Sequence, residues 1–239
     1  MLLIDIGQTV LGGPTRSPAG FITELLSLPQ SAKPLISDLV FSQNHSTAAD
    51  LIDDLSGALN CVFSDRQRAE LTGYWNAQLD ECLPLPGAGE FCQAIIDGKY
   101  PYALASNLWK PFHMALTRFI PELEANARFL FLSYVIGARK PSDDFYNHVF
   151  GTILDGTILE RPGNVVMIGD SFENDILPCL ARGAVCVMLD LANKSPDHGL
   201  IMKRAAAFPD GRLHLAGTYD ECLALLETII DQPTEPIQN

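Results

Sequence analysis

Residues that can do chemistry follow short apolar stretches at four places in this chain. Asp5 follows the first stretch, and Ser106 and Asn107 follow the second. Lys140 comes shortly after the third, and Asp170 follows a glycine at the end of the fourth. Taken singly these are weak signals, because a loop serine or an Asp in a turn is more often structural. Together they offer a nucleophile, hydrogen-bond donors, a charge-neutralising cation and hard oxygen ligands for a metal.

The apolar stretches themselves are predicted to be strands of one parallel sheet. Short apolar runs bounded by turn residues are typical of strands that are buried on both faces. Helical periodicity separates the runs, so we expect an α/β fold with right-handed crossovers. The carboxyl ends of such strands share one edge, where open α/β sheets bind their ligands. The predicted strands are 2–4, 102–105, 129–132 running on towards Val135, 164–168, 184–189 and a short 213–215.

A block of helical periodicity interrupts this alternation after the first strand. No strand signal appears in residues 15–83, and Ser64 with Gln67 forms a capping signal for one of its helices. The breaker cluster Pro84-Leu-Pro-Gly-Ala88 predicts the point at which the chain returns to the sheet. We therefore expect a core made of residues 1–14 and 84–239, with an all-helical insertion at 15–83.

The composition is that of an acidic globular protein. The chain has 239 residues, of which 47% are hydrophobic, and 16 Lys and Arg against 29 Asp and Glu give a net charge of −13. At a prior of about 150 residues per domain, this length predicts one domain, or one domain with an insertion. An acidic surface repels phosphate backbones and anionic membranes, so we expect neither nucleic acid nor a membrane as partner.

Cysteine usage and the N-terminus indicate a reducing compartment. The six cysteines are scattered without a C-x-x-C pair, and four of them (Cys92, Cys179, Cys186 and Cys222) lie among apolar residues. We expect buried thiols rather than disulfides or a zinc site. Asp5 interrupts the only apolar run at the N-terminus, and no stretch approaches the roughly 18 apolar residues of a membrane span. The predicted location is the cytoplasm.

Read together, the four polar clusters resemble the motifs of the haloacid dehalogenase-like (HAD-like) hydrolase superfamily. They occur in the family's order as Asp5-Ile-Gly-Gln-Thr-Val10, Ser106-Asn107, Lys140-Pro141 and Gly169-Asp-Ser-Phe-Glu-Asn-Asp175. The last motif is the most specific of the four. The resemblance implies a Rossmann-like core, with residues 15–83 as the α-helical (C1-type) cap. It also implies, most commonly, Mg²⁺-dependent phosphoryl transfer through an aspartyl-phosphate.

The resemblance assigns the nucleophile and the metal ligands. Asp5 would attack phosphorus, which a carboxylate can do when a metal and a lysine disperse its repulsion from the phosphoryl oxygens. The cofactor would be Mg²⁺, which prefers oxygen ligands and usually takes one or two protein carboxylates. Here the ligands would be Asp5, the backbone carbonyl of Gly7, and Asp170.

The remaining motif residues would bind the substrate or support the site. Ser106 would donate to a phosphoryl oxygen, with the backbone or amide of Asn107 beside it. Lys140 would neutralise the charge that builds on the equatorial oxygens. Ser171 and Asp175 would act from behind the site, with Asp175 orienting Lys140 or a water on the metal.

Position 7 departs from the family pattern. Most phosphatases of this superfamily carry a second Asp there, which protonates the leaving group and later activates water. Gly7 keeps the backbone carbonyl but supplies no acid or base. The leading hypothesis is nevertheless a hydrolase of the phosphatase type, acting on a small phosphorylated metabolite. Two alternatives are a 2-haloacid dehalogenase, in which Asp5 attacks carbon without a metal, and a catalytically weak or silent binding or regulatory protein.

Overall fold

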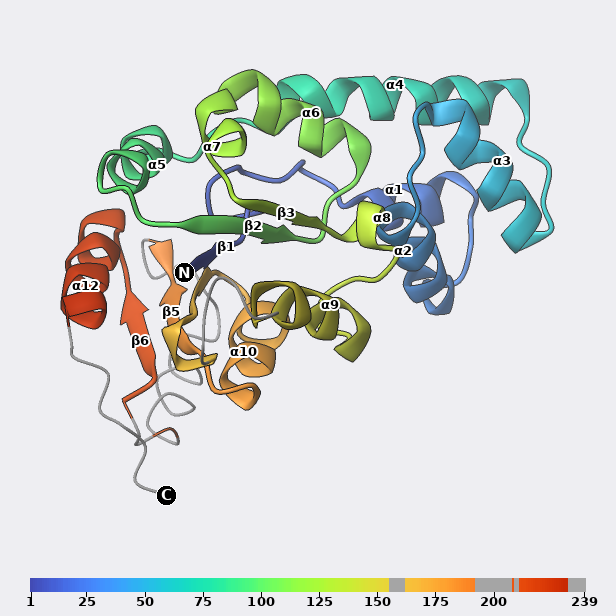
Figure 1. The fold of residues 1–239 in the computed structure, drawn as a ribbon. Helices are drawn as coiled ribbons and strands as arrows, with labels where there is room; N and C mark the ends of the chain where they lie inside the picture. The colour runs from blue at the N-terminus through green and yellow to red at the C-terminus, as the bar shows by residue number, and fades with distance from the viewer. Residues whose placement is uncertain (155–161, 192–207, 209–210, 232–239) are drawn as a thin grey trace.

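A six-stranded parallel sheet forms the centre of the computed structural model, which describes residues 1–154, 162–191, 208 and 211–231 (Figure 1). The strand order is β3-β2-β1-β4-β5-β6, and every neighbouring pair is parallel. The strands are β1 (Leu2–Ile4), β2 (Tyr102–Ser106), β3 (Phe129–Leu132), β4 (Val166–Gly169), β5 (Val185–Leu189) and β6 (Leu213–Ala216). The predicted parallel α/β fold class is confirmed.

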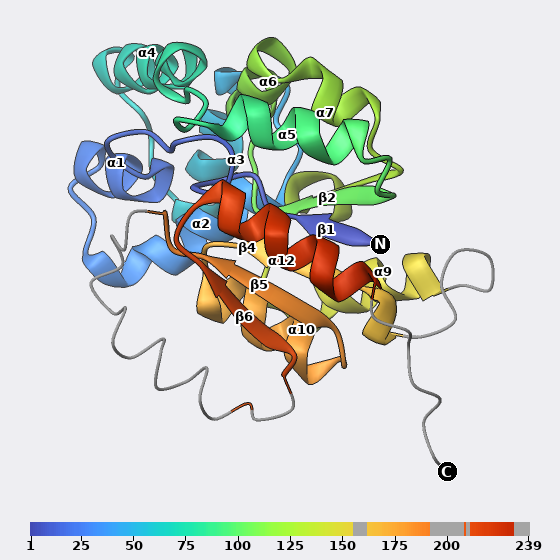
Figure 2. The same cartoon turned by 90° about the vertical axis from the view of Figure 1, so that its left-hand side faces the viewer.

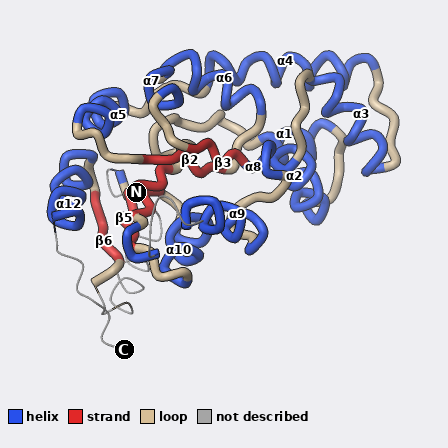
Figure 3. The backbone as a smooth tube through the Cα atoms, viewed as in Figure 1, coloured by secondary structure: helices blue, strands red, loops and turns tan. Residues whose placement is uncertain are grey.

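Helices cover both faces of this sheet, with the strands between them (Figure 3). One face packs against α5 (Ala88–Asp97), α6 (Lys110–Phe119), α7 (Pro121–Ala125) and α12 (Tyr219–Asp231). The other face packs against α9 (Asp143–Leu154) and α10 (Leu177–Ala181). Residues of β1, β2 and β4 are buried throughout, which is why their sequences read as continuous apolar runs.

Four of the five helices that lie between β1 and β2 in the chain fall in the predicted helical block. They are α1 (Pro18–Leu25), α2 (Lys33–Ser42), α3 (Ala48–Leu59) and α4 (Asp65–Glu81), with a short 3₁₀ turn, Gln30–Ala32, before α2. Their buried side chains belong to the same apolar cluster as α5 and α6. In Figure 1, α4 runs beside α6, and α2 lies against α8 (Ser133–Ile136). The predicted helical block is present, whereas its division from the core as a separate cap unit stays a prediction.

Local signals explain where these helices begin. Ser64 accepts a hydrogen bond from the backbone N–H of Gln67, whose side chain accepts one from the Ser64 N–H, so the predicted capping box at α4 is confirmed. Thr47 and Asp50 form the same reciprocal pair at the start of α3. Each pair satisfies two backbone donors that the first helical turn would otherwise leave without a partner.

The two ends of the helical block lie side by side. Leu11 and Pro84 form an isolated antiparallel bridge, and the Gly12 N–H donates to the Leu83 carbonyl at 2.8 Å. The Leu85 N–H donates to the carbonyl of Val10 at 3.0 Å. These contacts pair the start of the breaker cluster at Pro84 with the segment that follows β1.

The prediction that the third strand runs on towards Val135 was wrong. Strand β3 ends at Leu132, and Val135 belongs to helix α8, with 61% of its surface exposed. The Ser133 hydroxyl accepts a hydrogen bond from the Leu108 N–H at 3.0 Å and lies 3.2 Å from the Leu108 carbonyl, to which it also donates. A side chain therefore satisfies the backbone groups that another strand residue would have paired, and the backbone is free to turn into a helix.

The cysteines are free, as predicted. All except Cys61 are buried, and burial raises the pKa of the Cys92, Cys179 and Cys222 thiols to about 12. Thiols with such a pKa stay protonated and behave as small apolar side chains. Among the helices that the structure describes, none is long and apolar enough to cross a membrane.

Candidate active site

The carboxyl ends of the central strands gather the predicted residues at one edge of the sheet. Strand β1 lies between β2 and β4, and Ile4 is in register with both Leu104 and Ile168. Ser106 at the end of β2 and Asp170 after β4 therefore lie on either side of Asp5. This register follows from the packing of apolar strand residues and places the three polar side chains together.

A pocket of about 130 Å³ opens at this edge. It contains all eight residues that the sequence analysis singled out, together with Asn174, which that analysis did not assign. The lining residues are Asp5, Gly7, Ser106, Asn107, Lys140, Asp170, Ser171, Asn174 and Asp175.

Hydrogen bonds hold the Asp5 carboxylate in one orientation. Its Oδ1 accepts from the Ser106 hydroxyl at 2.8 Å and from the Lys140 ammonium at 2.6 Å. Its Oδ2 accepts from the Thr9 hydroxyl at 3.0 Å. Asp5 is only 4% exposed, so these donors replace water around the carboxylate. The sequence analysis did not assign this role to Thr9. Its position in the first motif, four residues after Asp5, could have indicated it.

Lys140 is a buried cation with every donor used. Its Nζ donates to Asp5 Oδ1, to Asp175 Oδ1 at 2.5 Å and to the Ala105 carbonyl at 2.9 Å. Burial opposes the charged form, but the Asp175 and Asp5 carboxylates outweigh it and raise the pKa of Lys140 above its ordinary value. The ammonium therefore stays charged beside the carboxylate of Asp5.

Asn107 supports Lys140 through its side chain. Its Nδ2 donates to the Lys140 carbonyl at 2.9 Å, and its Oδ1 accepts from the Lys140 N–H at 2.8 Å. The amide is thus engaged with the backbone 33 residues away. Of the two substrate contacts that we expected from Asn107, the one through its backbone stays a prediction.

Replacing Asn107 with Ala is expected to lower turnover more than stability. The change removes both hydrogen bonds that hold the Lys140 backbone, so the Lys140 side chain can shift within the pocket. Small displacements of a reacting group cost up to about 10²-fold in rate. We expect kcat to fall about 10- to 100-fold, measured beside the melting temperature. Asn126→Ala is the control, because the Asn126 side chain, at the C-cap of α7, donates to the Glu122 carbonyl of that helix. Equal kcat values for the two variants would show that the Asn107 side chain does not position Lys140.

The last motif folds around a close contact between Gly169 and Asp175. A Cβ at position 169 would lie 2.6 Å from Asp175 Oδ2, a separation that no side chain tolerates, so glycine is required there. The same Oδ2 accepts from the Ser171 N–H at 3.0 Å. The Ser171 hydroxyl accepts from the N–H and the side-chain amide of Asn174, and Ser171 is thereby the N-cap of the π-helical turn Phe172–Ile176. Ser171 therefore shapes the loop that presents Asp175 to Lys140.

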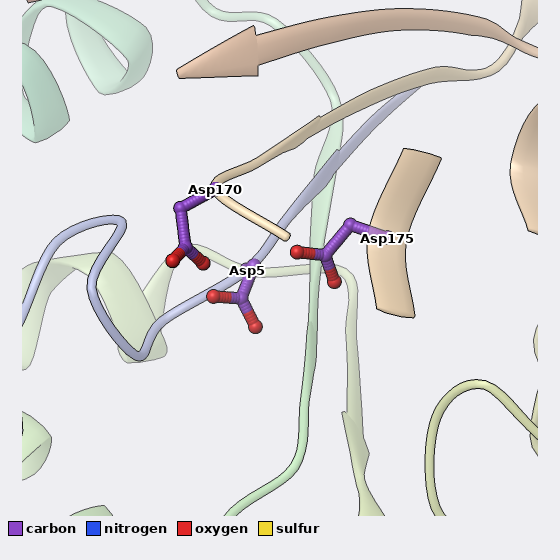
Figure 4. Close-up of side chains that lie close together, drawn as sticks. All are labelled: Asp5, Asp170 and Asp175. Atoms are coloured by element: carbon purple, nitrogen blue, oxygen red, sulfur yellow. The ribbon is translucent and has the colours of Figure 1, made fainter. Parts of the chain in front are cut away.

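Three carboxylates surround the pocket, and one ammonium cannot balance them. Oxygen atoms of Asp5, Asp170 and Asp175 lie within 4.8 Å of one another, and the side chains project toward a common centre (Figure 4). Burial and the charges of Asp5 and Asp175 raise the pKa of Asp170 to about 8. Burial, opposed by Lys140, raises the pKa of Asp175 to about 6. Such a set of hard oxygen donors with excess negative charge fits a divalent cation such as Mg²⁺.

Comparisons with known proteins show which fold this is. Neither a scan of protein-family models nor a search of curated proteins found a match. Solved structures do match: a HAD family hydrolase from Deinococcus radiodurans with bound phosphate and sodium has a TM-score of 0.56, at 20% identity over 95% of both chains. A HAD phosphatase from Thermococcus onnurineus has a TM-score of 0.54, at 15% identity over 94% of this chain and 96% of that one.

A third solved structure holds a metal as well as phosphate. It is a HAD family enzyme from Bacteroides thetaiotaomicron in complex with magnesium and inorganic phosphate, with a TM-score of 0.52 and 18% identity. The match covers 78% of this chain and 92% of that one. The sheet order, the helices between β1 and β2 and these matches agree with the resemblance of the four motifs. The chain therefore has the fold of the HAD-like hydrolase superfamily.

Proposed function

We propose that this protein is a Mg²⁺-dependent phosphatase that acts on a small phosphorylated metabolite through an aspartyl-phosphate on Asp5. The observation that carries the proposal is the meeting of Asp5, Lys140 and the acidic pair Asp170 and Asp175 in one pocket. Phosphoryl transfer needs little more than positioning and charge stabilisation, and these residues supply both. Solved structures of the same fold that bind phosphate support the same reading.

The size of the pocket suits the reacting group rather than a whole metabolite. Its volume of about 130 Å³ is well below the 300–1,000 Å³ that is common for sites holding drug-sized ligands. The pocket lining includes no residue of α1–α4. We infer that the phosphoryl group occupies the pocket, and that residues 15–83 form a cap which contacts the rest of the substrate.

The residues of the pocket divide the proposed reaction between them. An Asp5 oxygen attacks phosphorus, an O–P bond forms, and the bond to the leaving oxygen breaks. The Ser106 hydroxyl and the Lys140 ammonium, which now hold Asp5 Oδ1, would donate to the phosphoryl oxygens as charge develops there. Water then attacks phosphorus, which releases inorganic phosphate and restores the carboxylate of Asp5.

Mg²⁺ would be held by Asp5, the Gly7 carbonyl and Asp170. When bound, it offsets the repulsion between the carboxylate and the phosphoryl oxygens. Asp175 stays outside this set, because its Oδ1 is engaged with Lys140 and its Oδ2 with the Ser171 N–H. Asp175 thereby fixes the position of the lysine.

The acidic cluster favours this function over a 2-haloacid dehalogenase. A dehalogenase that works without a metal would bring an anionic substrate to three carboxylates that are balanced by one lysine. The third alternative, a silent binding protein, would not require a nucleophile whose two oxygens are both held by donors. Both features therefore support an active phosphatase.

A stability measurement tests the metal site without relying on turnover. Millimolar Mg²⁺ should raise the melting temperature by several degrees, because ligand bound at 100 times its Kd adds about 2.7 kcal/mol of stability. Asp170→Ala should lose this response. Asp53→Ala should keep it, since the side chain of Asp53 is 75% exposed on α3 and controls for the acidic surface. An equal Mg²⁺ shift in all three proteins would place the metal elsewhere.

Activity is tested by a screen of phosphorylated metabolites with Mg²⁺ and with EDTA. Acetyl phosphate and p-nitrophenyl phosphate serve as reference substrates with good leaving groups. We expect turnover with Mg²⁺ and its loss with EDTA. Activity on 2-haloacids that EDTA leaves unchanged would support the dehalogenase instead.

A further inference from the structure

Two buried hydrogen bonds, both made by Thr9, connect helix α12 with the proposed nucleophile Asp5; we call this pair of hydrogen bonds the relay. The Tyr219 hydroxyl, at the start of α12, donates to the Thr9 carbonyl at 2.7 Å. The Thr9 hydroxyl donates in turn to Asp5 Oδ2 at 3.0 Å. Tyr219 and Thr9 are 210 residues apart in the chain and meet because α12 packs beside α5 over the sheet (Figure 2).

Ring packing determines where the Tyr219 hydroxyl lies. The ring stacks on Phe91 of α5, with centroids 4.8 Å apart and an interplanar angle of 24°. On another side it approaches Gly87 so closely that a Cβ there would lie 3.2 Å from the ring. Tyr219 is only 8% exposed. A residue with these neighbours cannot swing freely, so its hydroxyl is a fixed donor.

The turn that carries Thr9 needs such a donor. The N–H groups of Thr9, Val10 and Leu11 all approach the carbonyl of Ile6, at 3.3, 2.9 and 2.9 Å. The turn's own carbonyls are held from outside, Val10 by the Leu85 N–H and Thr9 by the Tyr219 hydroxyl. Thr9 is fully buried, so its carbonyl would have no water in place of Tyr219.

We propose that Tyr219 is a positioning residue that holds the Thr9 turn and thereby the orientation of the Asp5 carboxylate. This inference rests on the proposed function, in which an Asp5 oxygen must be aligned with phosphorus. Without the anchor, the Thr9 hydroxyl shifts relative to Oδ2, and the carboxylate keeps only the donors on Oδ1. The attack geometry is then less well defined, which lowers the rate of the chemical step.

Tyr219→Phe tests the proposal, because it keeps the ring contacts with Phe91 and Gly87 and removes only the hydroxyl. We expect kcat to fall about 10- to 100-fold with KM nearly unchanged. Hydrogen exchange of the amides in residues 7–11 should become faster in the same variant. The matched control is Tyr102→Phe, since Tyr102 is also buried and its hydroxyl donates to the Leu123 carbonyl at 2.7 Å, away from the pocket. It should lower stability by a similar amount and leave kcat unchanged.

A double-mutant cycle separates the relay from general stability. In the background Thr9→Val, which lacks the second hydrogen bond, Tyr219→Phe should have little further effect on kcat. Additive losses, or equal kcat values for Tyr219→Phe and Tyr102→Phe in an active protein, would overturn the role of Tyr219 alone. Absence of Mg²⁺-dependent turnover in the unmodified protein would instead refute the proposed function, and the exchange rates of residues 7–11 would still decide whether Tyr219 anchors the turn.

Discussion

Asp5→Asn is expected to lower kcat on the order of 10⁴-fold or more, as removal of an enzyme nucleophile generally does. An amide nitrogen or oxygen does not form a stable acyl-phosphate. The variant keeps the size of the side chain; the Asn oxygen can still accept from the Ser106 hydroxyl, and the amide nitrogen in place of Oδ2 can donate to the Thr9 hydroxyl oxygen. It also removes one of the three clustered carboxylates, so folding should be retained.

Rates with acetyl phosphate, measured beside thermal melting of the same preparation, check this prediction. Asp97→Asn is the control, because Asp97 lies at the exposed end of α5, where it accepts a hydrogen bond from Gln93 of the same helix. That variant should match the unmodified protein in rate. Activity of Asp5→Asn within tenfold of the control would rule out the covalent mechanism.

Gly7→Asp is expected to speed the hydrolysis of alkyl phosphates by up to about 10²–10⁴-fold, the usual contribution of a positioned acid. The structure has room for the new side chain. A Cβ at Gly7 would meet only Phe112 Cε1, at 3.9 Å, and Gly7 is not among the glycines with positive φ. Gly7 lines the pocket, so we expect a carboxyl group there to reach the leaving group of a bound substrate.

A leaving-group series checks this second prediction. Without an acid, the leaving oxygen departs as an anion or takes its proton from water or the substrate. Rates of the unmodified protein should therefore fall steeply as the leaving-group pKa rises, and Gly7→Asp should flatten that dependence. Gly7→Asn is the control, because it fills the same space without an acid and should leave the slope steep. A flat dependence in the unmodified protein would show that another group already supplies the proton.

Local sequence patterns determined the sheet and most of the pocket. Strands buried on both faces need continuous apolar runs, and their carboxyl ends share one edge, so Asp5, Ser106 and Asp170 could be placed together from spacing alone. The capping box at Ser64 was equally readable, because its hydrogen bonds join residues three apart. Helical periodicity likewise located the block between the first two strands.

Only the tertiary structure decided how the chemical groups are paired. Asn107 was expected to contact the substrate through its backbone or its amide, and the amide binds the Lys140 backbone instead. The third strand was expected to run on towards Val135, which lies in helix α8. In both cases the deciding partner is distant in the chain. The hydrogen bond from Tyr219 to Thr9 likewise joins residues that are distant in the chain. A hydrogen bond across such a separation depends on strand register and on how helices pack over the sheet, and these are set by the whole buried core rather than by the residues around either partner.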